Sequence, residues 1–200
     1  TKPKKKKKKA PTRNAEMVAT VLNDEPLTLA EMVWSSPVAL GRFAPESVTD
    51  YLVQHLFRED DWVCVGEEFD SFCTTHRRHR YGFDPQQPGR ERIELREHRF
   101  IVPNPMAEQW GTTNEGNRSM RAKDSTCKHR RFLVVEFDSE PTKDAQAAIH
   151  AHLAQFAPLV LLVDSGGKSV HGFYYVEHRS RDQQRQFFDY AEKLGADPAL

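Results

Sequence analysis

Long hydrophobic runs and cysteine are both scarce in this sequence of 200 residues. No apolar stretch approaches the roughly 18 residues that a membrane-spanning helix needs, so we expect a soluble protein with no membrane partner. The amino end is a run of lysines without the apolar region of a secretory signal peptide, and three cysteines are too few for a disulfide framework. These absences predict a protein of a reducing compartment.

The sequence does contain enough apolar and aromatic residues for one folded domain. Hydrophobic residues make up 38% of the chain, which includes 12 phenylalanines and three tryptophans. The length is typical of a single domain, and this composition excludes a chain that is disordered throughout.

The net charge of zero conceals a basic tail and an acidic body. Seven lysines occupy positions 2 and 4 to 9, and without them 22 basic residues face 29 acidic ones, a net charge near −7. Residues 1–14 are therefore predicted to be a disordered basic tail, either a solvated segment or an arm for nucleic acid or nuclear import. Residues 15–200 are expected to form the folded domain.

Residues 15–130 are predicted to form an amino-terminal αβ unit with Arg-rich loops. Apolar residues recur at helical spacing from Ala15 to about Phe57, with prolines between the short helices. The segments Trp62–Gly66 and Phe100–Pro103 have the composition of buried strands.

Basic residues are concentrated in two stretches near this unit, a pattern typical of a polyanion-binding surface on an acidic body. Residues 76–99 contain seven arginines and four acids, and residues 121–131 contain five basic residues and one acid. A solvated surface is the alternative explanation. The candidate nucleic-acid-binding residues are Arg77, Arg78, Arg80, Arg121, Lys123, Arg130 and Arg131.

Residues 131–200 are predicted to form a ferredoxin-like, or RRM-like, β-α-β-β-α unit. Strand-forming residues occupy 132–138, 159–163 and 169–176, and helical patterns cover 144–156 and 180–194. This order is the split βαβ arrangement without its last strand, so we expect the chain to be truncated at the carboxyl end of its domain. The fold class is predicted as α/β, more narrowly α+β, with the amino-terminal unit packed on the ferredoxin-like unit.

Two carboxylates at the end of the first of these strands predict a metal site. Glu136 and Asp138 are two residues apart, so both side chains leave the same face of the strand, with Cα atoms ~7 Å apart. Burying two like charges is costly unless a cation neutralises them, and Mg²⁺ prefers carboxylate oxygens. Two solvent-exposed acids on a half-exposed sheet are the alternative.

A glycine-rich turn and the strand after it predict a phosphate site beside these acids. Ser169 and His171 alternate onto one face of their strand, and the hairpin can bring them next to the first strand. Two glycines in the turn free its backbone to approach a phosphate. The candidate nucleotide-binding residues are Ser165, Gly166, Gly167, Lys168, Ser169 and His171.

Both segments resemble motifs of the archaeo-eukaryotic primase superfamily, in particular the primase-polymerase domains of bacterial, plasmid and phage replication proteins. The strand LVVEFD (Leu133–Asp138) ends in an acid-x-acid pair, and SGGKSVHGFYY (Ser165–Tyr175) contains a Ser-x-His motif. Phe100–Met106 and Leu194–Pro198 also look like flanking segments of the phage-type members. The similarity covers about residues 48–200.

The resemblance implies roles for individual residues. In that family the acid pair holds catalytic divalent metals and the Ser-x-His motif contacts the phosphates of the incoming nucleotide. Glu136, Asp138 and His171 are thus the expected catalytic residues, the two acids binding Mg²⁺ or Mn²⁺. The third acid of the metal site is expected at or beyond the end of this chain, and Asp164 and Asp197 are the nearby substitutes.

The function implied is template-directed nucleotidyl transfer by two-metal catalysis, as a DNA primase, a DNA polymerase or both, in replication of a phage, plasmid or other mobile element. The expected partners are a single-stranded DNA template, ribo- or deoxynucleoside triphosphates, and a helicase domain or replication protein. The implied location is the cytoplasm of a bacterium or phage-infected cell, at the nucleoid. The lysine-rich tail leaves a nuclear location open.

Three other hypotheses fit parts of the sequence. An RNA-recognition domain shares the β-α-β-β-α order, although the two acids would then repel RNA phosphates from its platform. A non-catalytic binding subunit would have the same fold and a relic metal site. A structural zinc ion is the third, because five candidate N and S ligands occur in spacings that match no standard zinc finger. These ligands are Cys73, His76, His79, Cys127 and His129.

Overall fold

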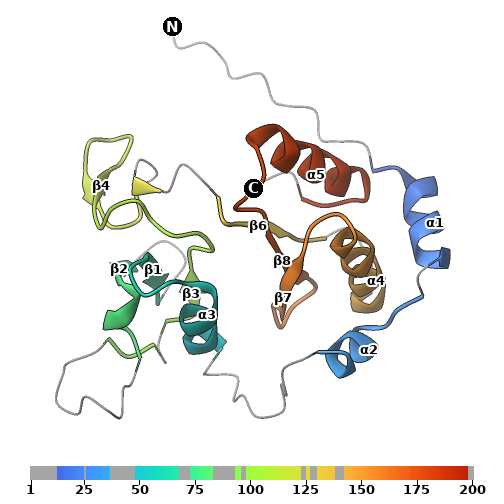
Figure 1. Cartoon of the computed structure of the whole chain (residues 1–200), viewed down its shortest axis with the longest axis horizontal. Coiled ribbons are helices and arrows are strands. Elements are labelled where there is room, and N and C mark those ends of the chain that lie inside the picture. Colours follow the sequence, from blue (N-terminus) through green and yellow to red (C-terminus); the bar gives the residue numbers. More distant parts are fainter. Residues whose placement is uncertain are drawn as a thin grey trace, which may run out of the picture. The chain divides into compact units, whose positions relative to one another are not determined.

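The computed structural model describes residues 13–24, 26–36, 48–67, 73–82, 93–95, 98–122, 125–126, 130–137 and 142–197. The chain divides into two compact units (Figure 1). Unit 1 contains Thr1–Pro37 and Phe132–Leu200, and unit 2 contains Val38–Arg131. Both combine helices with small antiparallel sheets, which confirms the α+β class.

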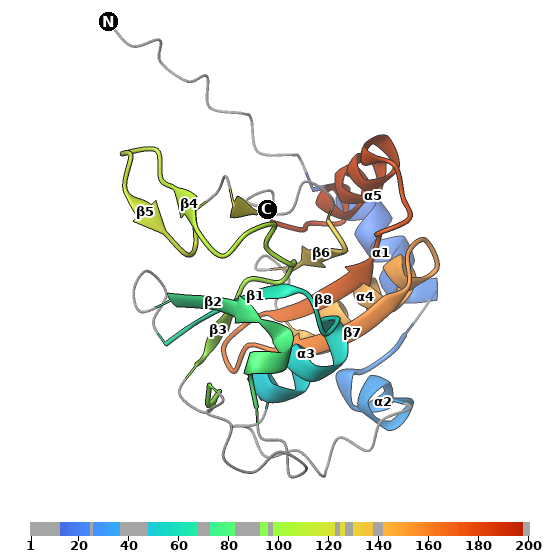
Figure 2. The ribbon, with the colours of Figure 1, turned by 60° about the vertical axis from the view of Figure 1, so that its left-hand side comes forward.

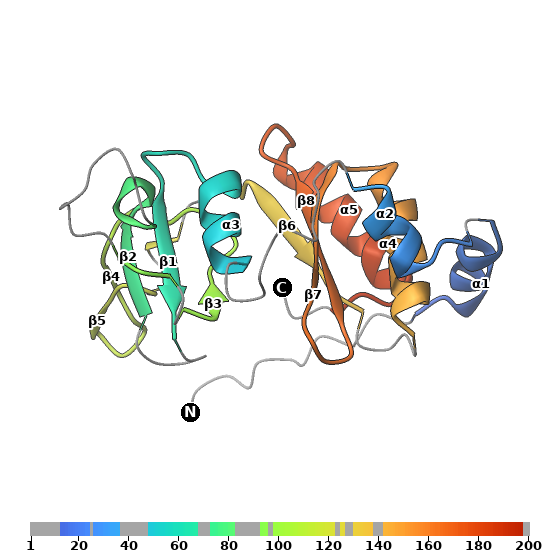
Figure 3. The same ribbon diagram turned by 90° about the horizontal axis from the view of Figure 1, so that it is seen from below.

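Unit 1 has the predicted element order β-α-β-β-α. Its strands β6 (Phe132–Val135), β7 (Leu159–Asp164) and β8 (Val170–Tyr175) form an antiparallel sheet in the order β6-β8-β7. The crossover after β6 is the helix α4 (Lys143–Ala154), and α5 (Arg181–Lys193) follows β8. Figure 3 shows both helices on one side of the sheet.

The core of unit 1 lies between this sheet and its helices. Alternate strand residues such as Val135 and Tyr174 are fully buried against Ile149 and Leu153, which lie one turn apart on α4. The helix α5 begins with a capping box, in which the Ser180 side chain accepts from the Gln183 amide. Gly195, with φ of +104°, follows the end of the helix.

Two amino-terminal helices belong to unit 1 and not to the αβ unit in which they were predicted. Residues Val18 and Val21 of α1 (Ala15–Asp24) join the core of unit 1. The first amide of α2 (Leu29–Trp34) donates to the Asp144 carboxylate at 2.9 Å, at the start of α4. The predicted contiguous segment 15–130 is therefore divided between the two units.

Unit 2 is built on the sheet β2-β1-β3. Figure 2 shows the helix α3 (Val48–Leu56) next to this sheet. The strand β1 (Trp62–Gly66) is at the predicted position, whereas β3 (Phe100–Ile101) is shorter than predicted. The other elements are β2 (Cys73–Arg77), the 3₁₀ turn η3 (Arg78–Arg80), and the short hairpin of β4 (Gly111–Thr112) and β5 (Arg118–Ser119). Among the described residues of the chain, no helix has the length and apolar character to cross a membrane.

Candidate functional site

The structure brings two of the predicted site residues into direct contact. Val135 on β6 pairs with Gly172 on β8, so Glu136, which directly follows β6, lies opposite His171. The His171 Nε2 atom is 2.9 Å from Glu136 Oε2. Both side chains are about one-third exposed, at 33% and 28%, so the pair remains open to a ligand.

The pair lies on the face of the sheet opposite the helices. Gly172 faces α4, because a Cβ atom at this position would lie 2.5 Å from the ring of His150. Side chains alternate along a strand, so His171 projects to the other face, together with Glu136. Asp138, the second acid of the predicted pair, lies outside the described residues, as does Lys123.

Asp197 returns to the same strand from the end of the unit. Its backbone N–H donates to the carbonyl oxygen of Glu136 at 3.0 Å, so the segment after α5 runs beside β6. This is the free edge at which a ferredoxin-like unit carries its last strand, because β8 occupies the other edge of β6. Of the two candidates for a third acid, Asp197 is thus the one beside Glu136.

Asp164, the other candidate, is engaged on the opposite face. It pairs with the buried Val170 across β7 and β8, which directs its side chain toward α4. There its carboxylate accepts from Lys143 Nζ at 2.6 and 2.8 Å and from the Gly166 amide at 2.8 Å. The hydrogen bonds from Lys143 and Gly166 lower the pKa of Asp164. We therefore leave Asp164 out of the candidate metal site.

The glycine-rich turn is closed by its own hydrogen bonds. Ser165 donates to the Ser169 carbonyl from both its amide, at 3.1 Å, and its hydroxyl, at 2.8 Å. The Gly166 amide donates to the Asp164 carboxylate, and the Gly167 amide donates to the Ser165 hydroxyl at 3.4 Å. In this geometry the two glycine amides serve the turn, not a phosphate. The positive φ of Gly166, +77°, explains why glycine is needed there.

Two of the predicted phosphate ligands differ sharply in exposure. Lys168 is exposed, so its ammonium group is accessible to a ligand. Ser169 is only 8% exposed, which leaves little room for its hydroxyl to meet a phosphate without a movement of the turn. The accessible donors on this side are therefore Lys168 and His171.

Buried polar residues of α4, which the sequence analysis missed, hold the start of β8. The Gln146 side chain accepts from the Val170 amide at 2.7 Å and donates to the Lys168 carbonyl at 2.9 Å, thereby fixing the backbone on both sides of Ser169. His150 contacts the Val170 carbonyl through Nε2 at 3.0 Å and the Tyr174 hydroxyl through Nδ1 at 2.8 Å. Burial lowers the pKa of His150 to about 4.

A signal for these two residues was present in the sequence. Gln146 and His150 are four residues apart and share the helix face of the buried Ile149 and Leu153. Polar side chains within an apolar stripe are expected to carry buried hydrogen bonds.

The predicted template-binding arginines of unit 2 separate into two groups. Three of them use their guanidinium groups within the unit. Arg131 forms a two-point ion pair with Asp61 at 2.5 and 3.1 Å, with only 8% of its side chain exposed. Arg78 donates to the Gln54 carbonyl at 2.9 Å. Arg77 donates to the Asp60 carbonyl and lies 4.0 Å from the centre of the Trp62 ring. The exposed members of the set are Arg80, Arg121 and Arg130.

Three of the five candidate zinc ligands lie within the described residues, and their positions do not support a shared zinc site. Cys73 and His76 are three residues apart on β2, so their side chains leave opposite faces of the strand. His79 lies in η3, with its Nδ1 atom 3.3 Å from the Glu59 carbonyl. Cys127 and His129 lie outside the described residues. Within the described ranges no three His, Cys, Asp or Glu side chains gather as a metal site would require.

Comparison of the chain with protein-family models, with curated proteins and with solved structures gives no significant match.

Proposed function

We propose that this chain catalyses metal-dependent nucleotidyl transfer on a single-stranded DNA template, as a DNA primase, a DNA polymerase or both, in replication of a phage, plasmid or other mobile element. The observation that carries the proposal is the contact between Glu136 and His171, which places a partly exposed carboxylate 2.9 Å from a partly exposed imidazole. Nucleotidyl transfer uses carboxylate-held metal ions and hydrogen-bond donors around the same phosphate groups.

The donor set fits a hard divalent cation. Glu136 offers partly exposed carboxylate oxygens, and the Asp197 backbone is hydrogen-bonded to the Glu136 carbonyl along the free edge of β6. Carboxylate oxygens and substrate phosphates are the usual ligands of Mg²⁺. In this proposal Glu136, Asp138 and Asp197 hold the metal, which would activate the attacking hydroxyl and stabilise the leaving pyrophosphate.

The other residues of the site bind and orient the nucleotide. His171 donates from Nε2 to Glu136 without a ligand, and the same donor turns to a phosphate oxygen when a metal occupies the carboxylate. Lys168 adds an exposed positive charge at the end of the turn. Gln146 keeps the backbone from Lys168 to Val170 in one position, so the two phosphate donors keep their spacing. Preorganised donors of this kind lose little entropy on binding.

A non-catalytic single-strand-binding function is the second candidate. It is favoured by an arginine–tryptophan stack in unit 2, where the guanidinium of the exposed Arg118 lies 4.2 Å from the Trp110 ring centre. Aromatic side chains beside cations are the usual means of binding single strands without sequence preference. This candidate requires strand binding without turnover.

Incorporation of labelled nucleotides on a single-stranded DNA template, with Mg²⁺ and separately with Mn²⁺, tests the proposal. We expect Glu136→Gln and His171→Ala to lower the rate by on the order of 100-fold or more, because each removes a group that acts on the reacting phosphates. Glu16→Gln, an exposed acid on α1, is the matched control and should keep full activity. Strand affinity should be equal in all of these variants.

Two results would contradict the proposal. Full incorporation by Glu136→Gln would remove this carboxylate from the metal site. A wild-type chain that binds the strand but incorporates no nucleotide with either metal would favour the non-catalytic function.

A further inference from the structure

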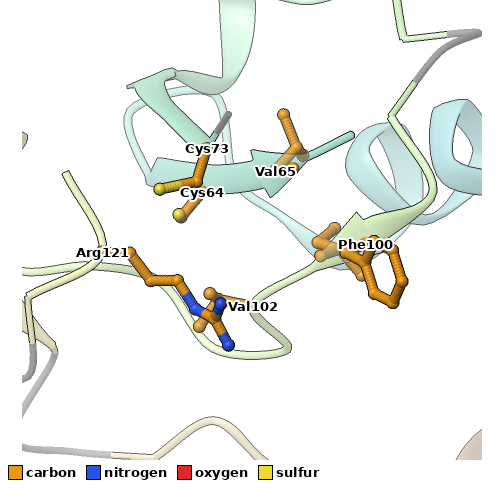
Figure 4. A pocket seen from close by; sticks show the side chains of 8 residues that line it. Cys64, Val65, Cys73, Phe100, Val102 and Arg121 are labelled. Carbon is orange, nitrogen blue, oxygen red and sulfur yellow. The ribbon is translucent and has the colours of Figure 1, made fainter. Parts of the chain in front are cut away.

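Two cysteines of unit 2 lie side by side on one face of its sheet. On β1 and β2, Cys64 pairs with Thr75 and Gly66 pairs with Cys73, so the two cysteines are diagonal neighbours. Residues that pair directly share a face, as do residues two apart on a strand, and both thiols therefore project to the same side. Figure 4 shows them next to each other, with the Arg121 side chain on that side.

The thiols line a small pocket of about 120 Å³. Its other lining residues are Val65, Gly66, Phe100, Ile101, Val102 and Arg121. Cys64 is buried, at 1% exposure, whereas Cys73 is partly exposed. Among the described residues that line the pocket, the cysteines supply the only sulfur ligands and Arg121 supplies the only charged side chain.

The spacing of the two cysteines suits a bridging metal better than a disulfide. Diagonal neighbours in an antiparallel sheet have Cβ atoms roughly 7 Å apart or slightly less. A disulfide requires a Cβ separation of about 3.5–4.5 Å, so it would force the strands to shift. A linear sulfur–metal–sulfur bridge spans about 4.6 Å if each bond is about 2.3 Å, and the two Cβ–Sγ bonds cover the difference.

The number of ligands and the local charge select the class of metal. Structural Zn²⁺ takes four ligands, and Mg²⁺ and Ca²⁺ take oxygen ligands, neither of which these lining residues provide. Soft thiolates favour Cu(I), a monovalent ion that accepts two sulfur ligands. Two thiolates and one such ion carry a net charge of −1, which the guanidinium of Arg121 balances.

We propose that Cys64 and Cys73 bind one soft monovalent d¹⁰ metal ion of the Cu(I) class as a two-coordinate bis-thiolate, with Arg121 as its counter-charge. Binding replaces two S–H bonds by two metal–sulfur bonds and releases two protons to solvent, with no change in oxidation state. The site is in unit 2 and does not depend on the proposed nucleotidyl transfer.

The protonation of the thiols predicts the pH dependence of this site. Burial raises the pKa of Cys64, and a hydrogen bond with Thr75 and the charge of Arg121 oppose part of that effect. Binding as a bis-thiolate displaces one proton from each S–H group. Because two protons are released for each metal ion, the affinity should rise by up to 100-fold per pH unit while both thiols still carry their protons.

The test is a titration of the full, reduced chain with Cu(I) under anaerobic conditions, in competition with bicinchoninate, a chromophoric Cu(I) chelator. We expect one Cu(I) per chain, two sulfur ligands by X-ray absorption, and loss of the site in Cys64→Ala and in Cys73→Ala. Cys127→Ser, the matched control for the third cysteine, should bind as the wild type does. Arg121→Gln should lower the affinity roughly tenfold, and Arg121→Lys should restore most of it.

Circular dichroism of each variant separates loss of metal from loss of fold. If Cys64→Ala does not fold, the partly exposed Cys73→Ala provides the decisive measurement. Absence of stoichiometric Cu(I) binding by the folded wild type, unchanged binding by folded Cys73→Ala, or loss of binding in Cys127→Ser would each overturn the proposal.

Discussion

Adding one methyl group at Gly172 should strongly destabilise unit 1, because this glycine lies directly against a buried histidine. A Cβ atom built at position 172 lies 2.5 Å from His150 Nδ1, 2.6 Å from its Cε1 atom and 3.0 Å from Tyr174 Cε2. His150 and Tyr174 are both fully buried, at 0% exposure, so neither ring can move into solvent. The imidazole would have to move by about 1 Å to restore ordinary contact distances.

The expected cost has two parts. Overpacking of a close-packed core typically costs about 1–3 kcal/mol. Moving the ring also stretches its hydrogen bonds to the Tyr174 hydroxyl, at 2.8 Å, and the Val170 carbonyl, at 3.0 Å. A buried polar group that loses its partner costs a further ~1–3 kcal/mol. We therefore expect Gly172→Ala to lower the free energy of unfolding by about 2–6 kcal/mol, more than most single substitutions do.

Urea unfolding followed by far-UV circular dichroism measures this change, and amide hydrogen exchange locates it in β8. Gly167→Ala is the matched control, since its Cβ would meet only the Ser165 hydroxyl at 3.7 Å, and it should change stability by less than about 0.5 kcal/mol. His150→Ala in the Gly172→Ala background should recover part of the loss, giving a coupling energy of at least ~1 kcal/mol. A Gly172→Ala chain within 1 kcal/mol of wild type would refute the reasoning.

Three further predictions concern pH, a buried ion pair and salt. The pKa of His150 is about 4 in the folded chain against an unfolded value of 6.5. As the pH falls, the His150 side chain is therefore protonated in the unfolded state before it is protonated in the folded state. The free energy of unfolding should fall by ~3 kcal/mol as the pH drops from 6.5 to 4. Urea titrations at several pH values should show that His150→Gln loses less stability on acidification than the wild type does. An identical loss in the two chains would contradict the assignment of this effect to His150. Arg131→Ala should cost ~3–5 kcal/mol by leaving the Asp61 carboxylate without its ionic partner, whereas the exposed Arg130→Ala should cost less than ~0.5 kcal/mol. Equal unfolding midpoints of these two variants would refute this contrast. With residues 1–9 removed, Arg80→Ala and Arg130→Ala should each reduce the log–log salt slope of single-strand binding by about 0.7 in fluorescence anisotropy, and unchanged slopes would exclude both residues from the template surface.

Local patterns were sufficient to predict most elements of unit 1. The strand expected at 132–138 is observed at Phe132–Val135, and the helix expected at 144–156 is observed at Lys143–Ala154. These patterns are strong because each element packs one face on the core, so its apolar residues repeat with the period of the strand or helix. The short strands of unit 2, such as Phe100–Ile101, have too few residues for a period to be recognised.

Contacts between distant residues could not be obtained from these patterns. The sequence marks Asp164 as an acid near the turn, but its ion pair with Lys143 depends on the register of β7 on β8. The same holds for Arg131, whose basic neighbourhood suggested a template contact and whose partner, Asp61, is 70 residues away. A side chain is available for binding only if no partner from elsewhere in the fold has already engaged it.

The sequence by itself determined the α+β class, the order of elements in residues 131–200 and the presence of His171 on a strand, with Glu136 just after another, because periodicity and turn residues act over a few positions. Only the tertiary structure decided that these two side chains meet at 2.9 Å, that the backbone of Asp197 returns beside that of Glu136, and that Cys64 lies beside Cys73. The physical reason is strand register: a shift of one residue between paired strands moves every side chain to the opposite face, and core packing of the whole unit selects the register.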